Sequence, residues 1–404
     1  MPASTRHYEG RQRFVNDLEG VRLEGTGVRR LAAQVHKLLV TQTLRLALLP
    51  TAYCLPPTKK SLAKFHSPAT ICPAKSMPKK TRAPVRHLGD LVPLLLWSDG
   101  FGEVLAALQR GDSGTIGGAW GSACALTTAA LADKAPGTLL VVLPRISEVD
   151  DFADDVAGLC GFDPVLFPAW DSLPKDHRIT DVTFGARLRV LRALTSTNPP
   201  KIIVTSIPAL LQPVPSRDEL IRGTRTFSAG DEIAPEELVR DLVDLGLEHV
   251  TGIEMPGEFS MHGGIVDIFS PDAENPLRLE FFGDELESIR TFDVETQRKL
   301  EDLNEAAITL VTPPGRDDES NGDRLAGEHF LDFIPPQPWI ALIEPEELVG
   351  EGKHYLERLD DPRGFYQVDA TLARCMQHPT VTISALAGDS FEATCHLRIE
   401  SVER

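Results

Sequence analysis

A glycine-rich turn with the sequence GGAWGSACA begins at Gly117 and is the first stretch whose residue types suit chemistry. Glycine-rich loops that open into a helix hold phosphate groups on their backbone N–H groups. A working nucleotide site also needs a Lys for the terminal phosphates and a Ser or Thr hydroxyl for Mg²⁺. Cys124 and Ala125 occupy these two positions, so we expect Gly117, Gly118 and Gly121 to form a degenerate loop without a bound cofactor.

A second stretch, RLEFFGDELE from Arg278, places an Asp-Glu pair after an apolar run, as Mg²⁺ sites of ATPases do. Gly283 and Asp284, however, form a dipeptide that is typical of tight hairpin turns, and the flanking residues alternate. We therefore expect a meander rather than a metal site. It comprises three short strands, at residues 262–269, 276–282 and 286–292.

Alternation along the middle strand of this meander separates an apolar face from a mixed one, because successive side chains point to opposite faces. The apolar face carries Leu277, Leu279 and Phe281, and the other carries Arg278, Glu280 and Phe282. Arg and a large aromatic together on an exposed face are enriched in binding hot spots. A solvated face with one stray aromatic explains the same pattern, since single exposed apolar residues are common.

Other residue types give weaker signals. The histidines show no HxxxH or HExxH spacing, and the six cysteines are scattered without a CxxC pair. This pattern argues against a zinc ribbon or a disulfide scaffold and favours a reducing cytoplasm. The chain has no run of about 18 apolar residues, so we expect no membrane-spanning helix.

Charge divides the chain into a basic head and an acidic body. Residues 1–90 hold 16 Lys/Arg and 5 Asp/Glu, whereas the whole chain of 404 residues holds 41 and 59. We expect residues 1–87 to be a basic, disordered extension, with Met77 as an alternative true start. An acidic body suits partners other than the nucleic acid backbone, because phosphate neutralisation needs clustered Lys/Arg.

Hydrophobic patterning predicts an α/β protein with a parallel sheet, because short apolar runs alternate with helical stretches. Strands are expected at residues 139–143, 164–167, 201–206, 340–344 and 381–383, and helices at 101–110, 122–132, 147–160 and 178–194. Ser147 is expected to cap its helix, with Asp150 completing a capping box. Gly111 is expected to end the first helix.

A change in composition after residue 211 marks a second region. A strand is expected at residues 224–227, and Leu238, Leu242 and Leu245 form one stripe of a helix that Gly246 ends. The domains expected from these patterns are an α/β part at 88–215, an α+β part at 216–311 and a second α/β part at 312–404.

Several motifs resemble one known family. GEFSMHGGIVDIF and PLRLEFFGDELESIRTFDVETQRKL closely resemble the UvrB-homology region of bacterial transcription-repair coupling factors. LFPAWDSLPKDHRITDVTFGARLRVLRAL, IIVTSIPALLQPVP and FEATCHLRIESVER resemble neighbouring segments of that family, in the right order, over about residues 88–404. The resemblance implies a degenerate helicase-like (P-loop NTPase-like) domain with an inserted α+β UvrB-interaction domain. UvrB carries GATGTGKT where this chain has GAWGSACA.

The resemblance also implies a function. The inserted domain of the family binds UvrA in nucleotide excision repair, and two family contact residues are matched by Arg278 and Phe282. A third contact position, commonly Arg, holds His262, which is a departure from the family. The full-length family is an ATP- and Mg-dependent DNA translocase that reaches RNA polymerase and DNA through later domains. We expect this chain to stop before them and to lack an ATPase of its own.

Three functions are therefore compared. The first is a cytoplasmic UvrA-recruiting module for transcription-coupled repair. The second is an ATP-dependent, UvrB-type DNA-loading protein or helicase subunit, which requires nucleotide at the loop that contains Cys124 and Ala125. The third is a truncated product with no retained function.

Overall fold

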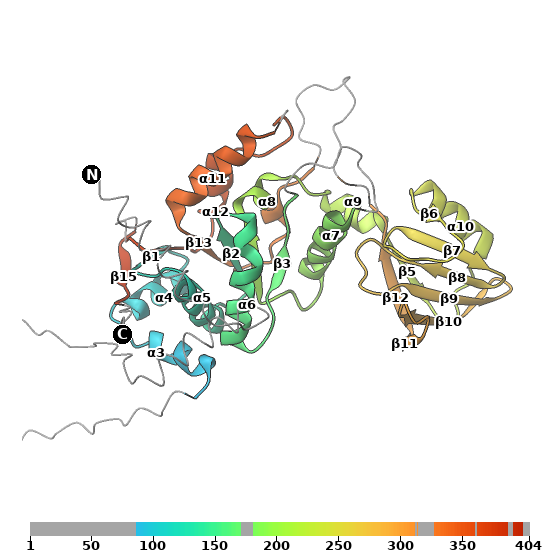
Figure 1. Ribbon diagram of the computed structural model, residues 1–404, viewed down its shortest axis with the longest axis horizontal. Coiled ribbons are helices and arrows are strands. Elements are labelled where there is room, and N and C mark those ends of the chain that lie inside the picture. The colour runs from blue at the N-terminus through green and yellow to red at the C-terminus, as the bar shows by residue number, and fades with distance from the viewer. Residues whose placement is uncertain are drawn as a thin grey trace, which may run out of the picture.

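The computed structural model describes residues 86–170, 181–311, 313, 327–359, 362–386 and 391–398. The expectations for residues 1–85, including Met77, lie outside the described residues. In the described ranges the chain forms two sheet-containing parts (Figure 1). We call residues 224–310 the inserted domain and the described residues on either side of it the parallel-sheet domain.

The parallel-sheet domain is built on a seven-stranded sheet in which every neighbouring pair is parallel. Its order is β15 (Ala393–His396), β1 (Gly114–Gly117), β14 (Thr380–Ser384), β13 (Trp339–Ile343), β2 (Leu139–Leu143), β4 (Ile202–Ser206) and β3 (Val165–Phe167). All residues of β2, β4 and β13 are buried. This burial on both faces explains why the strands read as continuous apolar runs.

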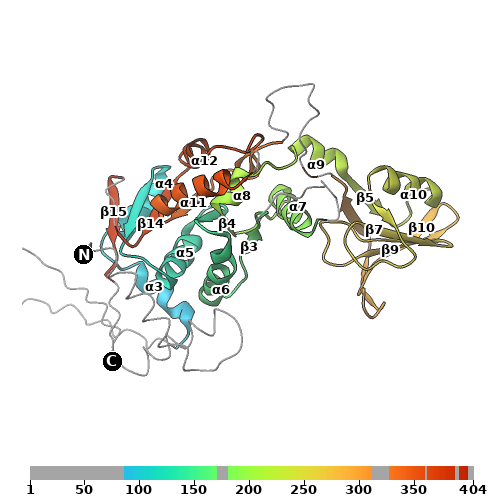
Figure 2. The ribbon, with the colours of Figure 1, turned by 45° about the horizontal axis from the view of Figure 1, so that its top comes forward.

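Helices cover both faces of this sheet (Figure 2). One face packs against α3 (Val92–Leu95), α4 (Phe101–Arg110), α5 (Ser122–Lys134) and α6 (Val149–Cys160). The other packs against α7 (Val182–Thr195), α8 (Ile207–Leu211), α11 (Pro345–Glu357) and α12 (Val368–Cys375). Short elements complete the domain: η1 (Leu88–Leu91), η2 (Ile146–Glu148), α9 (Arg217–Gly223) and η3 (Phe330–Phe333). The expected α/β class with a parallel sheet is confirmed.

The ends of two helices test the sequence expectations. Helix α4 ends as expected at Gly111, which adopts a left-handed conformation with φ of 95°. The expected cap at Ser147 is wrong, because Ser147 lies inside the 3₁₀ turn η2 and α6 begins only after Glu148. The backbone N–H of Glu148 donates to Arg145 O (3.3 Å), which closes this turn ahead of the helix.

The inserted domain is α+β. Its six-stranded sheet has the order β11 (Lys299–Leu303), β10 (Glu285–Phe292), β9 (Leu277–Phe282), β8 (Ile265–Ile268), β7 (Glu258–His262) and β6 (Glu248–His249). A two-stranded sheet pairs β12 (Glu305–Thr309) with β5 (Thr224–Ser228). Helix α10 (Pro235–Asp244) packs Leu238 and Leu242 into the same core as Leu279. Leu245, expected on that stripe, is exposed because it follows the end of the helix.

The meander contains four strands where three were expected: the strand expected at residues 262–269 is present as the shorter β8, and the strand β7 before it was not expected. The chain turns at Gly263 and Gly264 and joins β7 to β8 as an antiparallel hairpin. Gly263 has φ of +59°, and a Cβ at Gly264 would lie 2.6 Å from Phe281 O. Two glycines in succession are a known hairpin signal, and they account for this turn. The expected turn at Gly283 is present, with φ of +64°.

The chain enters and leaves the inserted domain at one place, where the backbone N–H of Leu310 donates to Gly223 O (2.8 Å). Helix α7 of the parallel-sheet domain touches the inserted domain nearby. A Cβ at Gly185 would lie 2.0 Å from Pro271 O, so only glycine permits this approach of α7 to the turn.

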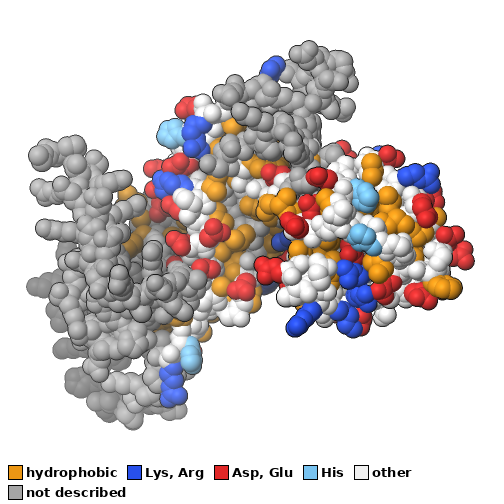
Figure 3. All heavy atoms as spheres, turned by 45° about the vertical axis from the view of Figure 1, so that its right-hand side comes forward, with side chains coloured by type: hydrophobic (Ala, Val, Ile, Leu, Met, Phe, Trp, Pro, Cys, Tyr) orange, Lys and Arg blue, Asp and Glu red, His pale blue; other side chains and the backbone are white. Residues whose placement is uncertain are grey.

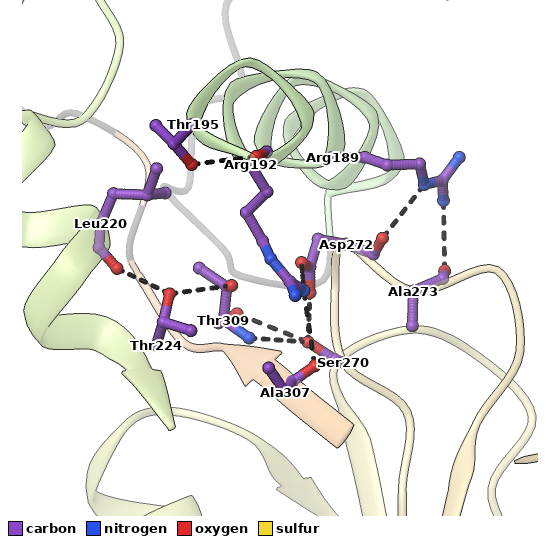
Figure 4. Close-up of polar contacts among 10 residues, drawn as sticks. All are labelled: Arg189, Arg192, Thr195, Leu220, Thr224, Ser270, Asp272, Ala273, Ala307 and Thr309. Carbon is purple, nitrogen blue, oxygen red and sulfur yellow. Dashed lines mark hydrogen bonds and ion pairs between the residues drawn. The ribbon is translucent and has the colours of Figure 1, made fainter. Parts of the chain in front are cut away.

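Two arginines on α7 bind the same turn (Figure 4). Arg189 donates from Nε to Asp272 O (3.0 Å) and from Nη2 to Ala273 O (3.2 Å). Arg192 forms an ion pair with the carboxylate of Asp272, which also accepts a hydrogen bond from Ser270. The Asp272 side chain is buried, and a buried carboxylate requires such partners. The contacts of Arg189 and Arg192 with this turn therefore fix the inserted domain against α7.

Candidate functional site

The first candidate site is the face of β9 that points away from α10. Leu277, Leu279 and Phe281 are buried in the core of the inserted domain, as the alternation predicts. Arg278 and Glu280 on the opposite face are half-buried, and Phe282 is 75% exposed. The expectation that this strand presents an aromatic side chain to solvent is therefore confirmed.

Arg278 is held by its own domain. Its guanidinium donates from Nε to Asp267 Oδ1 (2.7 Å) and from Nη2 to Asp267 Oδ2 (2.8 Å). Nη2 also donates to Gln297 Oε1 (3.2 Å), and the guanidinium carbon lies 4.3 Å from the centre of the Phe292 ring. The hydrogen bonds to Asp267 raise the pKa of Arg278 above its ordinary value. The face expected to be exposed at Arg278 is thus largely covered there and is open only toward Phe282.

Glu280, between these two residues, is also satisfied internally. It accepts a hydrogen bond from Ser288 Oγ (2.7 Å) and pairs with Arg290, both on the neighbouring strand β10. Beyond it, Phe282 ends the strand, and the turn that follows exposes Asp284 and Glu285. Phe282 is therefore the large uncovered group in a row of side chains that otherwise have partners.

His262 lies two strands away from β9 on the same face. The register pairs it with Ile265 of β8, and Ile265 in turn pairs with Glu280. Its Nε2–H donates to Thr251 O (2.7 Å), and its side chain is exposed. The sheet thus brings His262, Arg278 and Phe282 to one face, although they are separated in sequence.

The surface of the inserted domain is mixed in charge despite the acidic chain. In the view of Figure 3, several Lys and Arg side chains gather on the inserted domain beside hydrophobic and His side chains. Acidic side chains are spread over both domains in the same view. The inserted domain therefore presents basic side chains among acidic and apolar ones.

The second candidate site is the glycine-rich loop between β1 and α5, whose strand–loop–helix order matches that of a phosphate-binding loop. Here the chain itself covers the loop. Leu397 donates its backbone N–H to Gly117 O (2.8 Å), and a Cβ at Gly118 would lie 2.1 Å from Leu397 O. The N–H of Ala119, which could face a phosphate, donates to Ser384 O (3.2 Å).

The side chains of this loop and its helix are engaged in packing. Cys124 and Ala125 are buried, and burial raises the pKa of the Cys124 thiol to about 12, so it is protonated at neutral pH. Ser122 Oγ donates to Asp155 Oδ2 (2.9 Å), and burial raises the pKa of Asp155 to about 6. This set does not fit a magnesium nucleotide, which needs a cation for the phosphates and a free hydroxyl for the metal.

Several residues that shape the first site carry no local sequence signal. Asp267 faces Arg278 from β8, Phe292 ends β10, and Gln297 lies between β10 and β11. Among the described residues, no cluster of three or more His, Cys, Asp or Glu side chains is arranged to hold a metal ion.

At the carboxyl end of β2, Arg145 forms ion pairs with Glu148, Glu347 and Glu351 at 2.8–2.9 Å. Burial alone would lower the pKa of Arg145, but the three carboxylates raise it overall. These contacts join η2, which precedes the inserted domain in the sequence, to α11, which follows it.

None of the helices in the described ranges has the length and apolarity that crossing a bilayer requires.

Comparison with known proteins identifies sequences that are similar to this chain. The family of UvrB interaction domains matches residues 226–312. The chain is similar to the transcription-repair-coupling factor of Mycobacterium bovis, with 37% identity over 190 residues, which are 45% of this chain and 15% of that protein.

Two further relatives carry the same name, transcription-repair-coupling factor. That of Bacillus subtilis is 30% identical over 214 residues (52% of this chain, 18% of that protein). That of Escherichia coli is 27% identical over 208 residues (50% and 18%). The matched stretch therefore spans less than a fifth of the length of each of these relatives.

Proposed function

From the UvrB-homology region that this chain shares with transcription-repair-coupling factors, we propose that it is a UvrA-recruiting interaction module for transcription-coupled nucleotide excision repair. The single observation that carries the proposal is Phe282, which is 75% exposed at the end of β9 within the matched residues 226–312. Arg278 lies on the same face and is held in one position by its domain.

The physical basis of docking is burial of Phe282. Removing a phenylalanine side chain from water stabilises a complex by roughly 1.5–3 kcal/mol. Arg278 and His262 lie beside it as polar groups that give orientation, in the manner of a hot spot with a polar surround. Because Arg278 already has partners, apolar contact at Phe282 contributes more to the binding free energy than Arg278 does.

We call the face of the sheet that carries His262, Arg278 and Phe282 the docking face. The parallel-sheet domain serves, in this proposal, as the support that presents this face. Arg189 and Arg192 of α7 bind the turn of the inserted domain that contains Asp272. The loop between β1 and α5 is covered by Leu397, which argues against a function that depends on nucleotide at this place. Contacts with RNA polymerase and DNA are proposed to belong to parts of such proteins outside the matched stretch.

Calorimetric titration of the chain with purified UvrA tests this function. We expect Phe282→Ala to weaken binding about 30-fold, from the loss of roughly 2 kcal/mol of buried apolar contact. Leu300→Ala is the matched control, because Leu300 is also an exposed apolar residue on a strand of the same domain, and it should change affinity less than about twofold. Equal loss in both variants, or no binding by the wild-type chain, contradicts the proposal.

The second function, an ATP-dependent loading protein, is tested separately. A titration with ATP and Mg²⁺ should give no heat of binding at micromolar nucleotide, because the loop has neither the cation nor the free hydroxyl that the nucleotide requires. Micromolar binding that Gly118→Ala abolishes would favour the loading function instead.

A further inference from the structure

Arg278 has a limited set of free donors, and this limits what it can bind. The guanidinium carries five N–H groups in a rigid plane. Nε–H and one N–H of Nη2 bind the two oxygens of Asp267, and Nη2 also binds Gln297. Within the described chain no residue accepts a hydrogen bond from Nη1. The two N–H groups of Nη1 are the ones left for another molecule.

Asp267 is the residue that determines this arrangement. It lies on β8 directly opposite Arg278 and is 6% exposed. A carboxylate at this depth needs a cation with good geometry, because a buried charge without a partner is strongly destabilising. Both of its oxygens are bound by Arg278, so the side of the guanidinium that contains Nε is occupied.

Two further residues fix the plane of the guanidinium. The ring of Phe292, which is fully buried, lies under it at 4.3 Å. Gln297 donates from Nε2 to Val294 O (2.9 Å), and this orients its carbonyl oxygen toward Arg278. Arg278 is thus held by a carboxylate at one edge, an amide oxygen at Nη2 and an aromatic ring beneath.

We propose that Asp267 is the positioning residue of the docking face, which holds Arg278 so that Nη1 alone donates to the partner. The partner then supplies one acceptor oxygen to Nη1. A carboxylate that binds Arg278 with both oxygens is excluded, because each pair of adjacent donors in the plane includes a group that is already bound. This inference rests on the proposed docking of UvrA, and it assigns a function to a residue that does not itself reach the partner.

A double-mutant cycle with UvrA tests the coupling. We expect Asp267→Asn and Arg278→Ala each to weaken binding about tenfold, and the double variant to be no weaker than the single variants, because both changes remove the same contact. Asp241→Asn is the matched control. It breaks the 2.6 Å ion pair of Arg225 and Asp241 on α10, on the other side of the sheet, and should leave affinity unchanged. Multiplicative losses, or tighter binding by Asp267→Asn, overturn the proposal.

A second measurement does not require UvrA. In the free chain, the Arg278 guanidinium should rotate slowly in ¹⁵N NMR spectra of the side chain, and Asp267→Asn should make its rotation fast while Asp241→Asn should not. Gln297→Asn provides a variant that keeps the fold, since Asn tolerates the φ of +55° at this position and is too short to reach Arg278. It should speed rotation and weaken binding about two- to threefold.

The two measurements separate the possible failures. If the wild-type chain does not bind UvrA, the proposed function fails, and the NMR result alone decides whether Asp267 positions Arg278. If UvrA binds but rotation is fast in the wild type or unchanged in Asp267→Asn, the positioning function fails and the docking function stands.

Discussion

The loop after β1 and the end of strand β9 differ in whether the groups that could bind another molecule are covered by the chain itself. At the loop, the chain's own backbone from Leu397 and Ser384 occupies the groups that would face a ligand. At β9, internal partners occupy the charged side chains, and the apolar Phe282 is left exposed. A motif with the right order of elements can thus be closed by its own fold. A plain strand, by contrast, can present a binding group.

The largest effect expected from this contrast comes from two adjacent phenylalanines. Phe281 lies in the core of the inserted domain, whereas Phe282 lies outside it. Phe281→Ala should lower the free energy of unfolding by about 3–5 kcal/mol, and Phe282→Ala should change it by less than about 0.5 kcal/mol. Urea denaturation measures both. A comparable loss of stability in the two variants would mean that Phe282 has a structural function.

A second variant tests whether the loop after β1 is closed by the chain or only lacks the side chains that bind a nucleotide. Cys124→Lys combined with Ala125→Thr puts back the cation and the hydroxyl, but at two buried positions. We expect a loss of about 3 kcal/mol or more in stability, because a longer side chain and its ammonium must be buried in a packed site, and no gain of nucleotide affinity, because Leu397 still covers the loop. Denaturation and ATP titration check the two parts. Micromolar ATP binding by this variant would show that the covering backbone is easily displaced.

The stability of the protein should depend on pH through one buried histidine of the parallel-sheet domain. Burial lowers the pKa of His329, in the parallel-sheet domain, from 6.5 to about 4, and nearby Arg374 adds to the shift. Above pH 6.5 the His329 contribution to stability is fully present. As the pH falls toward 4 the unfolded chain binds the proton first, and about 3 kcal/mol is lost.

His329→Asn provides the control for this effect. Asn does not titrate and is a good helix cap, so it can replace the Nδ1 that accepts from the N–H of Leu331 (3.1 Å). Urea denaturation between about pH 7.5 and 4.5 should show a shallower pH dependence in this variant than in the wild type. Parallel curves for the two proteins would contradict the assignment.

The smallest expected effect concerns His262. His262→Arg introduces the residue that the resemblance to the family implies at this position, and on the proposed docking face it should tighten UvrA binding two- to fivefold, about 0.5–1 kcal/mol, through a charge-assisted hydrogen bond. His249→Arg is the control, because His249 is an exposed histidine on the next strand. Titration calorimetry with both variants is the measurement. An equal gain from both would indicate general electrostatic attraction instead.

The sequence predicts the parts of this fold whose signal is local. Strands β2 and β4 are buried on both faces and read as apolar runs, and α4 carries its end signal at Gly111. Strands β1 and β15 are not predicted, because they are short and contain few apolar residues. Their position in the sheet comes from pairing with each other and, for β1, with β14, which no local pattern encodes.

The candidate site divides in the same way. Alternation along β9 is sufficient to place Phe282 outside the core, because the period of a strand is local. The partner of Arg278 is not predicted by alternation along β9 alone, since it depends on the register between β8 and β9, and a shift of one residue would move Asp267 to the other face. Phe292 and Gln297 come from still later in the chain and meet Arg278 only in the folded domain.

The hydrogen bond between Leu310 and Gly223 has a consequence for how the protein folds. While the inserted domain is unfolded, it is a loop of about 87 residues between strands of the parallel sheet in the sequence. Closing such a loop costs roughly 4 kcal/mol of chain entropy. Once folded, its two ends already lie side by side and this entropic penalty disappears. Strands on either side of the insertion, such as β4 and β13, can then enter one sheet without the penalty. Loss of the inserted domain's fold should therefore weaken the distant sheet without any change in the sheet's own contacts.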